Sequence, residues 1–212
     1  MVKFLLLAAI SAMGQKPAPT IDYYKLSPSD FFALAEVHQT IDADALDREL
    51  LEAAVFFASV EIRKNEEAFQ YGPLLSKSAR FHAEYLESIG TLEHLNRNNK
   101  KYRTPMMRAD AFGANYIATA ENLARLSLLN LENNGRYYVN EQGQYVSEKG
   151  EPISFHTYAS LARKVVDGWM HSKGHRKNLK GDYNYLGCGV SRVVSISDGV
   201  PEVYFNQNFG KK

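Results

Sequence analysis

Hydrophobic side chains recur at helical spacing along three stretches of the chain. The widest apolar stripe covers residues 43–65 and predicts a long, largely buried helix. A second stripe covers residues 75–89 and ends at Gly90, a residue type that commonly follows a helix. A third follows Ser154, a favourable N-cap, and ends at His171. These helices can share one hydrophobic core.

The last part of the chain changes to an alternation of apolar and other positions with a period of two. Residues 186–190 and residues 203–209 alternate in this way and predict strands, with Asp198-Gly199 as a turn between them. Upstream, residues 136–139 and 145–146 predict a small surface hairpin. Because strands follow helices without regular strand–helix alternation, the order indicates an α+β fold and argues against a doubly wound parallel sheet.

The amino-terminal part is expected to consist of a cleaved segment and a leader that packs on the main domain. Residues 1–14 combine a positive charge, an apolar run and small residues, in the order of a secretory signal peptide. Their apolar run, residues 4–10, is far shorter than the roughly 20 residues of a membrane helix, and no transmembrane segment is expected. The alternative is a buried N-terminal strand or helix. Residues 15–43 predict a leader with a short helix at residues 31–38, and residues 44–212 form the domain. Export would make the protein secreted or periplasmic.

Composition excludes several kinds of partner. The 212 residues contain 25 Lys and Arg against 24 Asp and Glu, and removal of residues 1–14 takes away Lys3 and leaves 24 of each. No bulk charge recruits nucleic acid, and the basic stretch at residues 96–108 lacks the aromatic spacing that stacks bases, so a solvated loop is predicted there. Cys188 is the one cysteine, which excludes an intramolecular disulfide and a Cys-cluster zinc site. On an alternating strand it is expected to be a buried, unreactive thiol.

Three short segments bring together the residue types that carry chemistry. They are Leu92–Leu95, Ala120–Leu123 and Trp169–Leu179, and the predicted C-terminal strands follow them. In this order they resemble the CAP superfamily, also called SCP-like extracellular proteins, over the chain from about residue 44 onward. The resemblance implies an α-β-α sandwich, with a small antiparallel sheet flanked by helices. Because the disulfides of many eukaryotic members are missing, the chain looks like a bacterial-type member.

The resemblance implies that His94 and His175 meet in a solvent-open cleft with Glu121 beside them. Neutral imidazoles are good zinc ligands, so the pair implies a site for zinc or another divalent metal, and no organic cofactor is expected. Glu121 would orient a histidine or accept a proton as a catalytic base. Many members carry a second acid shortly after the tryptophan, and Ser172 stands at that place here. Further motif residues expected to support the cleft are Asn122, Trp169, Ser172, Arg176 and Asn178.

The site residues also have structural interpretations. His94 can bond a backbone carbonyl in its loop, and Glu121 can stand at a helix start, where its charge complements the helix dipole. Gly174 would permit an unusual turn that aims His175, with Arg176 pinning a carboxylate or carbonyls.

Other side chains are expected to be structural. Trp169 and a hydrogen-bonded His82 belong to the core in this interpretation, and Ser172 ends a helix rather than acting as a nucleophile. His156 and His171 form no recognised metal-binding pair.

Three functions remain open from the sequence. The first is an exported binding or interaction module whose cleft takes a divalent metal and whose grooves bind a lipid, a peptide or a cell-envelope component. The second is a metal-assisted or acid–base hydrolase of peptide, ester or cell-envelope substrates, in which Glu121 activates water. Because no HEXXH helix is present and Ser172 replaces the second acid, the hydrolase ranks below the binding module. The third is a structural envelope protein whose cleft is a relic.

Overall fold

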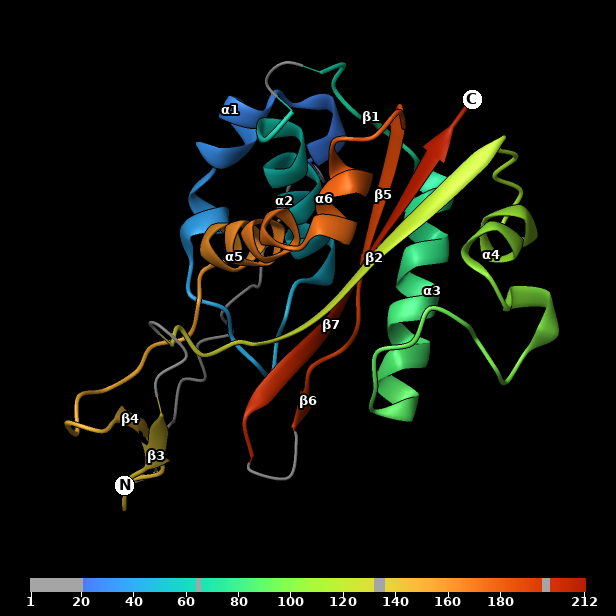
Figure 1. The fold of residues 1–212 in the computed structure, drawn as a ribbon. Helices are drawn as coiled ribbons and strands as arrows, with labels where there is room; N and C mark the ends of the chain where they lie inside the picture. The colour runs from blue at the N-terminus through green and yellow to red at the C-terminus, as the bar shows by residue number, and fades with distance from the viewer. Residues whose placement is uncertain (1–20, 64–65, 132–135, 196–198) are drawn as a thin grey trace, which may run out of the picture.

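Helices flank both faces of a small β-sheet, as Figure 1 shows for the computed structural model. The structure describes residues 21–63, 66–131, 136–195 and 199–212. The expected signal segment, the end of the first long helix at Asn65, and Asp198 of the expected turn lie outside these residues. The predicted α+β class and α-β-α sandwich are confirmed.

One helical layer lies on each side of the sheet (Figure 1). The first layer contains α1 (Pro28–Phe32), α2 (Arg48–Glu61), α5 (Tyr158–His171) and α6 (Lys173–Leu179). The second contains α3 (Pro73–Ile89) and α4 (Pro105–Ala111). Short 3-10 helices lie at η1 (Tyr23–Lys25), η2 (Ala35–His38) and η3 (Lys100–Tyr102). None of the helices in the described residues is both long enough and apolar enough to cross a bilayer.

Strand β7 (Pro201–Lys211) lies in the middle of the sheet. It pairs antiparallel with β2 (Ala118–Ser127) on one side and with β5 (Tyr185–Val190) on the other. Strand β1 (Gln70–Tyr71) extends the order to β1-β5-β7-β2 by pairing parallel with β5, and β6 (Val194–Ser195) pairs antiparallel with the start of β7. The sheet is therefore antiparallel except at the β1–β5 pair.

Glycine alternates with larger buried residues along β5 because helix α3 packs directly on one face of this strand. A Cβ atom added to Gly187 would lie 2.2 Å from the backbone nitrogen of Ser76, and one added to Gly189 would lie 2.1 Å from that of Arg80. Glycine therefore allows the backbone of α3 to approach β5. The intervening Leu186, Cys188 and Val190 are buried in the main hydrophobic core, so both faces of β5 are covered.

The ends of the long helices follow their capping residues. Helix α3 ends as predicted, because Gly90 takes the left-handed conformation (φ +69°) and its N–H donates to the carbonyl of Leu86 at 2.9 Å. Helix α2 starts later than the apolar stripe, where the Asp47 carboxylate accepts a hydrogen bond from Leu50 N.

The cap predicted at Ser154 is wrong. Phe155 pairs with Leu129 as a β-bridge, which keeps the chain extended until Thr157. Thr157 and Ser160 then form a reciprocal capping box that starts α5.

Two further expectations are corrected by the structure. Glu121 does not stand at a helix start; it lies inside β2, because the segment pairs with β7 along its whole length. Residues 96–108 are not only a solvated loop, since η3 and the start of α4 lie there and Arg108 is fully buried. Thr104 caps α4 by accepting from Met107 N, and Pro105 occupies the first helical position.

The described part of the leader packs into the domain core. The helix predicted at residues 31–38 is divided into α1 and η2. Phe31, Val37 and Ile41 are at most 1% exposed and belong to the same cluster as the core of α2 and α5. The ring of Phe31 stacks on that of Phe57 with centroids 4.5 Å apart. Residues 21–43 therefore share the core of the domain that follows them.

The predicted surface hairpin is confirmed. Strands β3 (Tyr137–Val139) and β4 (Tyr145–Ser147) pair antiparallel, with Tyr138 opposite Val146. The hairpin projects from the body of the fold at the lower left of Figure 1, and Tyr138 and Val139 are more than half exposed.

Candidate functional site

A buried carboxylate, that of Glu121 on β2, lies at the centre of the candidate site. His94 Nδ1 donates a hydrogen bond to its Oε1 atom at 2.9 Å. Arg108 Nη2 and Asn206 Nδ2 donate to its Oε2 atom, the latter at 2.9 Å. Burial acts to raise the pKa of Glu121, but the hydrogen bond from His94 and the charge of Arg108 outweigh it and hold the pKa below its ordinary value. The carboxylate is thus a buried anion with both oxygens engaged.

His94 lies in the loop after α3 and faces solvent. Its side chain is 56% exposed, although Nδ1 is bonded to Glu121. The hydrogen bond to Glu121 raises the pKa of His94 against the opposing effect of its partial burial. Because Nδ1 is occupied, Nε2 is the ring nitrogen that can face a ligand.

His175 lies on α6, close enough to His94 for the two charges to interact. Burial lowers the pKa of His175, and the charge of His94 lowers it further. The expectation of an unusual turn at Gly174 is wrong, because Gly174 lies inside α6 and is not among the glycines with positive φ. A regular helix, not a loop, positions this histidine.

Two asparagines join the helix that carries His175 to the strand that carries Glu121. Asn178 Nδ2 donates to the Asn122 side-chain oxygen at 2.9 Å and to the Glu121 carbonyl at 3.2 Å. Asn122 Nδ2 donates in turn to the His175 carbonyl at 3.3 Å. The two motif segments therefore have a direct polar connection, which fixes α6 against β2.

Arg108 is the residue of this site that the sequence did not reveal. Besides Glu121, it binds three backbone carbonyls through Nη1, each at 3.2 Å: those of His94, Tyr102 and Arg103. The Thr104-Pro105 pair is a helix-start signal that could have indicated α4, but nothing local marks an arginine after it as fully buried. Arg108 both neutralises the carboxylate and holds the loop of His94.

His82 is a core histidine beside this cluster, as predicted. It is fully buried, its Nε2 atom hydrogen-bonds with the Glu93 carbonyl at 2.8 Å, and it lies 3.9 Å from Glu121 Oε1. Burial lowers the pKa of His82 to about 4, so its ring is neutral at neutral pH.

The remaining motif residues have structural contacts. Trp169 is 2% exposed, and its indole N–H donates to the Leu123 carbonyl at 3.0 Å. Ser172 joins α5 to α6, and Arg176 N donates to its carbonyl at 2.8 Å. Arg176 Nη1 binds the Met170 carbonyl at 3.1 Å, which agrees with its expected pinning role.

Among the residues that the structure describes, the side chains around Glu121 do not form a closed metal cage. Within the described ranges, no three or more His, Cys, Asp or Glu side chains are grouped so that they could hold a metal ion. Both oxygens of Glu121 accept hydrogen bonds from the side chains of His94, Arg108 and Asn206, so neither is directed at a ligand. Cys188 is buried, and burial raises its pKa, so the thiol is unreactive as expected.

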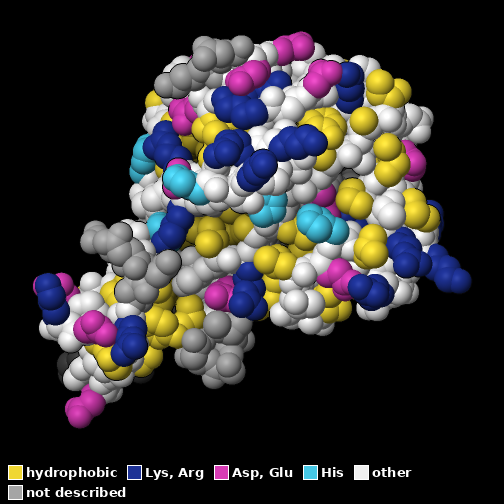
Figure 2. Space-filling view, in the orientation of Figure 1, with side chains coloured by type: hydrophobic (Ala, Val, Ile, Leu, Met, Phe, Trp, Pro, Cys, Tyr) yellow, Lys and Arg dark blue, Asp and Glu magenta, His cyan; other side chains and the backbone are white. Residues whose placement is uncertain are grey.

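The surface of this side of the molecule places histidines near its middle. Figure 2 shows histidine side chains at the left of this face and others near its middle, the latter beside hydrophobic side chains.

An α-β-α sandwich in which a strand-borne glutamate orients a loop histidine defines the class of protein. The model of the CAP family, described as the cysteine-rich secretory protein family, matches residues 63–209. The chain belongs to this family, and the resemblance drawn from its motifs is confirmed.

Comparisons with known proteins find further similarities. An extracellular protein containing a SCP domain from Bacillus anthracis matches with a TM-score of 0.52 and 18% identity, over 78% of this chain and 41% of that one. An outer surface protein from Borrelia burgdorferi matches with a TM-score of 0.48 and 20% identity, over 74% of this chain and 90% of that one. The uncharacterized membrane protein YlbC of Bacillus subtilis is 38% identical over 66 residues, and this chain spans only 16% of its length.

Proposed function

We propose that this protein is an extracytoplasmic CAP-domain binding module in which His94 and His175 form the ligand-facing pair. The hydrogen bond from His94 to the buried Glu121 carries the proposal, because it fixes the ring and directs Nε2 outward. Export is supported by the signal-like pattern of residues 1–14 and by the extracellular description of the Bacillus anthracis protein.

A divalent metal such as zinc is the simplest ligand for this pair. A carboxylate that binds the second nitrogen of a ligating histidine fixes the ring and increases its basicity, and Glu121 has this relation to His94. When bound, the metal would supply an electrophilic centre with open positions for an oxygen or nitrogen donor. The adjoining apolar surface favours a lipid, a peptide or a cell-envelope component as the larger partner.

The same geometry favours binding over hydrolysis. A base that activates water needs a free oxygen, whereas both Glu121 oxygens accept hydrogen bonds from side chains. Ser172 also stands where a second acid was expected. Hydrolysis of peptide, ester or cell-envelope substrates is therefore the second candidate, and a structural envelope protein with a relic cleft is the third.

Calorimetric titration with zinc tests the pair directly. We expect saturable binding to the wild type that is lost in the double variant His94→Ala/His175→Ala. The matched control is His171→Ala, because His171 is exposed at the end of α5 and should leave the heat unchanged. Equal heats for the wild type and the double variant would contradict the proposal.

Turnover of peptide, ester and peptidoglycan panels separates the two leading functions. We expect no product above that of buffer from the wild type. Product that is lost in both Glu121→Gln and His94→Ala would establish the hydrolase instead. The second variant is needed because Glu121→Gln leaves the buried Arg108 charge unpaired, whereas His94 is exposed and can be replaced without emptying the core.

A further inference from the structure

A pocket outside the histidine site opens between the leader and the amino-terminal ends of α2 and α3. Its volume is about 570 Å³, which is within the range of small-molecule sites. It contains none of the residues of the histidine site. Any ligand bound there would be independent of His94 and His175.

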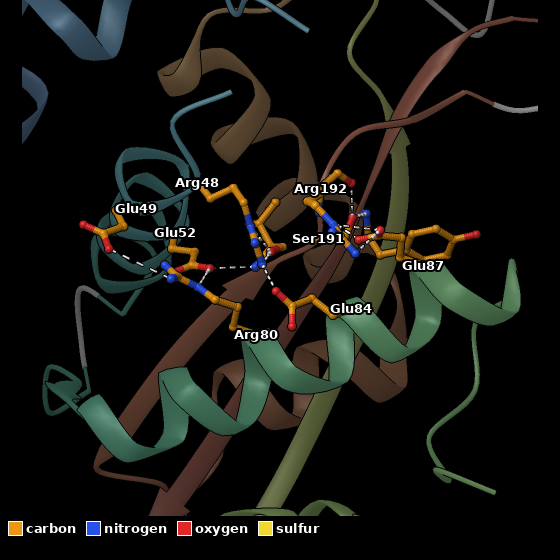
Figure 3. Close-up of polar contacts among 10 residues, drawn as sticks. Arg48, Glu49, Glu52, Arg80, Glu84, Glu87, Ser191 and Arg192 are labelled. Carbon is orange, nitrogen blue, oxygen red and sulfur yellow. Dashed lines mark hydrogen bonds and ion pairs between the residues drawn. The ribbon is translucent and has the colours of Figure 1, made fainter. Parts of the chain in front are cut away.

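The pocket has a rigid charged base formed by Glu52 and Arg80. Glu52 is only 3% exposed and accepts two hydrogen bonds from Arg80, the one from Nε at 2.8 Å. Its Oε1 atom also accepts from Val190 N at 3.0 Å. Figure 3 shows both glutamates of α2, Glu49 and Glu52, directed toward Arg80 on α3. The base is therefore preformed, and Glu52 and Arg80 largely neutralise each other.

Tyrosine rings form the walls. Tyr24 and Tyr71 stack with centroids 3.4 Å apart and planes 6° from parallel. Tyr24 also meets Phe56 edge to face at 5.4 Å, which anchors the wall in the hydrophobic core. Tyr23 completes the aromatic lining from η1. Such rings offer flat apolar surface whose π-electrons attract cations.

The charged side chains that line the pocket determine whether it favours a cationic or an anionic ligand. Four carboxylates, from Asp22, Asp47, Glu49 and Glu52, line the pocket against two basic groups, those of Lys77 and Arg80. Asp47 caps α2, and Asp22 pairs with Lys25. Glu49 is 76% exposed in its side chain and has only a long 3.9 Å contact with Arg80, so it is free to meet a ligand.

We propose that this pocket between η1, α2 and α3 binds an organic cation, a primary amine or a guanidinium on a short aliphatic chain. The aliphatic part packs on the tyrosine rings while the cationic group approaches Glu49. An anion would meet an excess of negative charge, and a neutral chain would lack the ionic contact. A free amine and a lysine side chain of a peptide offer the same chemistry.

Three ligands of equal chain length and different charge test the proposal: 1,5-diaminopentane, 1,5-pentanediol and glutarate. Calorimetry on the full protein is expected to show saturable binding of the diamine alone. Glu49→Gln should weaken it about fivefold, and added salt should also weaken it. Lys77→Gln should strengthen binding, because it removes a positive charge from the rim. Acetyl-lysine-methylamide, compared with the diamine, shows whether a peptide side chain serves as well.

Two control variants distinguish binding in this pocket from binding at the histidine site. Asp44→Asn removes an exposed carboxylate outside the pocket and should leave diamine binding unchanged. The double variant His94→Ala/His175→Ala should also bind the diamine normally, whatever happens to zinc. The proposal is overturned if neither amine binds saturably, if the diol or glutarate binds more tightly than the diamine, or if Glu49→Gln and Asp44→Asn behave alike.

Discussion

At the scale of single residues, the buried charge of Glu121 determines what its neighbours can do. Arg108 is fully buried and supplies the balancing positive charge, while His94 contributes a hydrogen bond from the surface. Removal of one partner from such a buried pair is costly, because the remaining charge keeps its desolvation penalty without compensation. Glu121 therefore contacts the ring of His94 directly and the loop of His94 only through Arg108.

A second buried histidine makes stability depend on pH. His156 is 3% exposed, its Nδ1 atom is 2.9 Å from Ser160 Oγ, and Lys164 Nζ is 3.4 Å from Nε2. Burial and the charge of Lys164 lower its pKa from 6.5 to about 4. Between these values the unfolded chain binds more protons than the folded one, so stability is lost as the pH falls through this window, by up to about 3 kcal/mol.

Urea unfolding at several pH values between 7 and 4 measures this dependence. His156→Gln should flatten the pH dependence of the unfolding free energy, while the exposed His171→Gln should leave it as in the wild type. The pKa of His82 is lowered in the same way, so part of the pH dependence of the unfolding free energy should remain in His156→Gln. An unchanged slope in His156→Gln would contradict the assignment.

At the scale of elements, the parts of the fold with local signals were predictable and those that depend on distant partners were not. The apolar stripe of α3 and the glycine that ends it, Gly90, can both be read from the local sequence, and the helix ends at the predicted position. On β2 the consecutive residues Glu121, Asn122 and Leu123 are all buried, so both faces of the strand are covered there. The alternation of apolar and polar residues that would indicate a strand is therefore absent from the sequence. Its pairing partner β7 lies some 80 residues away, so the local sequence does not distinguish this strand from a helix start.

Replacing two glycines by alanine is expected to have opposite effects, because only one of them, Gly189, lies where α3 approaches β5 closely. Gly189→Ala would place a Cβ 2.1 Å from the backbone nitrogen of Arg80, and should destabilise the fold by about 3 kcal/mol or more. Gly168→Ala, inside α5 with no atom within 4 Å of the added Cβ, should stabilise it by about 0.5–1 kcal/mol. Thermal and urea unfolding of both variants checks the signs. Equal stability of the two would show that α3 and β5 can separate without cost.

At the scale of the whole molecule, residues 21–43 of the leader are part of the folded unit. Phe31 is fully buried, stacks on Phe57 of α2 and meets Tyr23 edge to face at 5.6 Å. One leader residue thus supports both the hydrophobic core and a wall of the cation pocket.

Phe31→Ala is expected to destabilise the entire protein by about 3–5 kcal/mol, because it empties a site in the shared core. Unfolding should remain a single transition whether followed by circular dichroism or by the fluorescence of Trp169. Val139→Ala, on the exposed hairpin, is the control and should change stability by less than about 0.5 kcal/mol. Two separate transitions in Phe31→Ala, or no loss of stability, would show that the leader folds apart from the domain.

The position of β7 has a consequence for how the chain can fold during synthesis. This strand joins β2 to β5, yet it comprises Pro201–Lys211 and so follows both of them in the chain. A nascent chain that has reached residue 200 contains β2 and β5 without the strand that pairs with both. The sheet therefore closes only after β7 has left the ribosome, and until then the apolar strands have to be kept from aggregating.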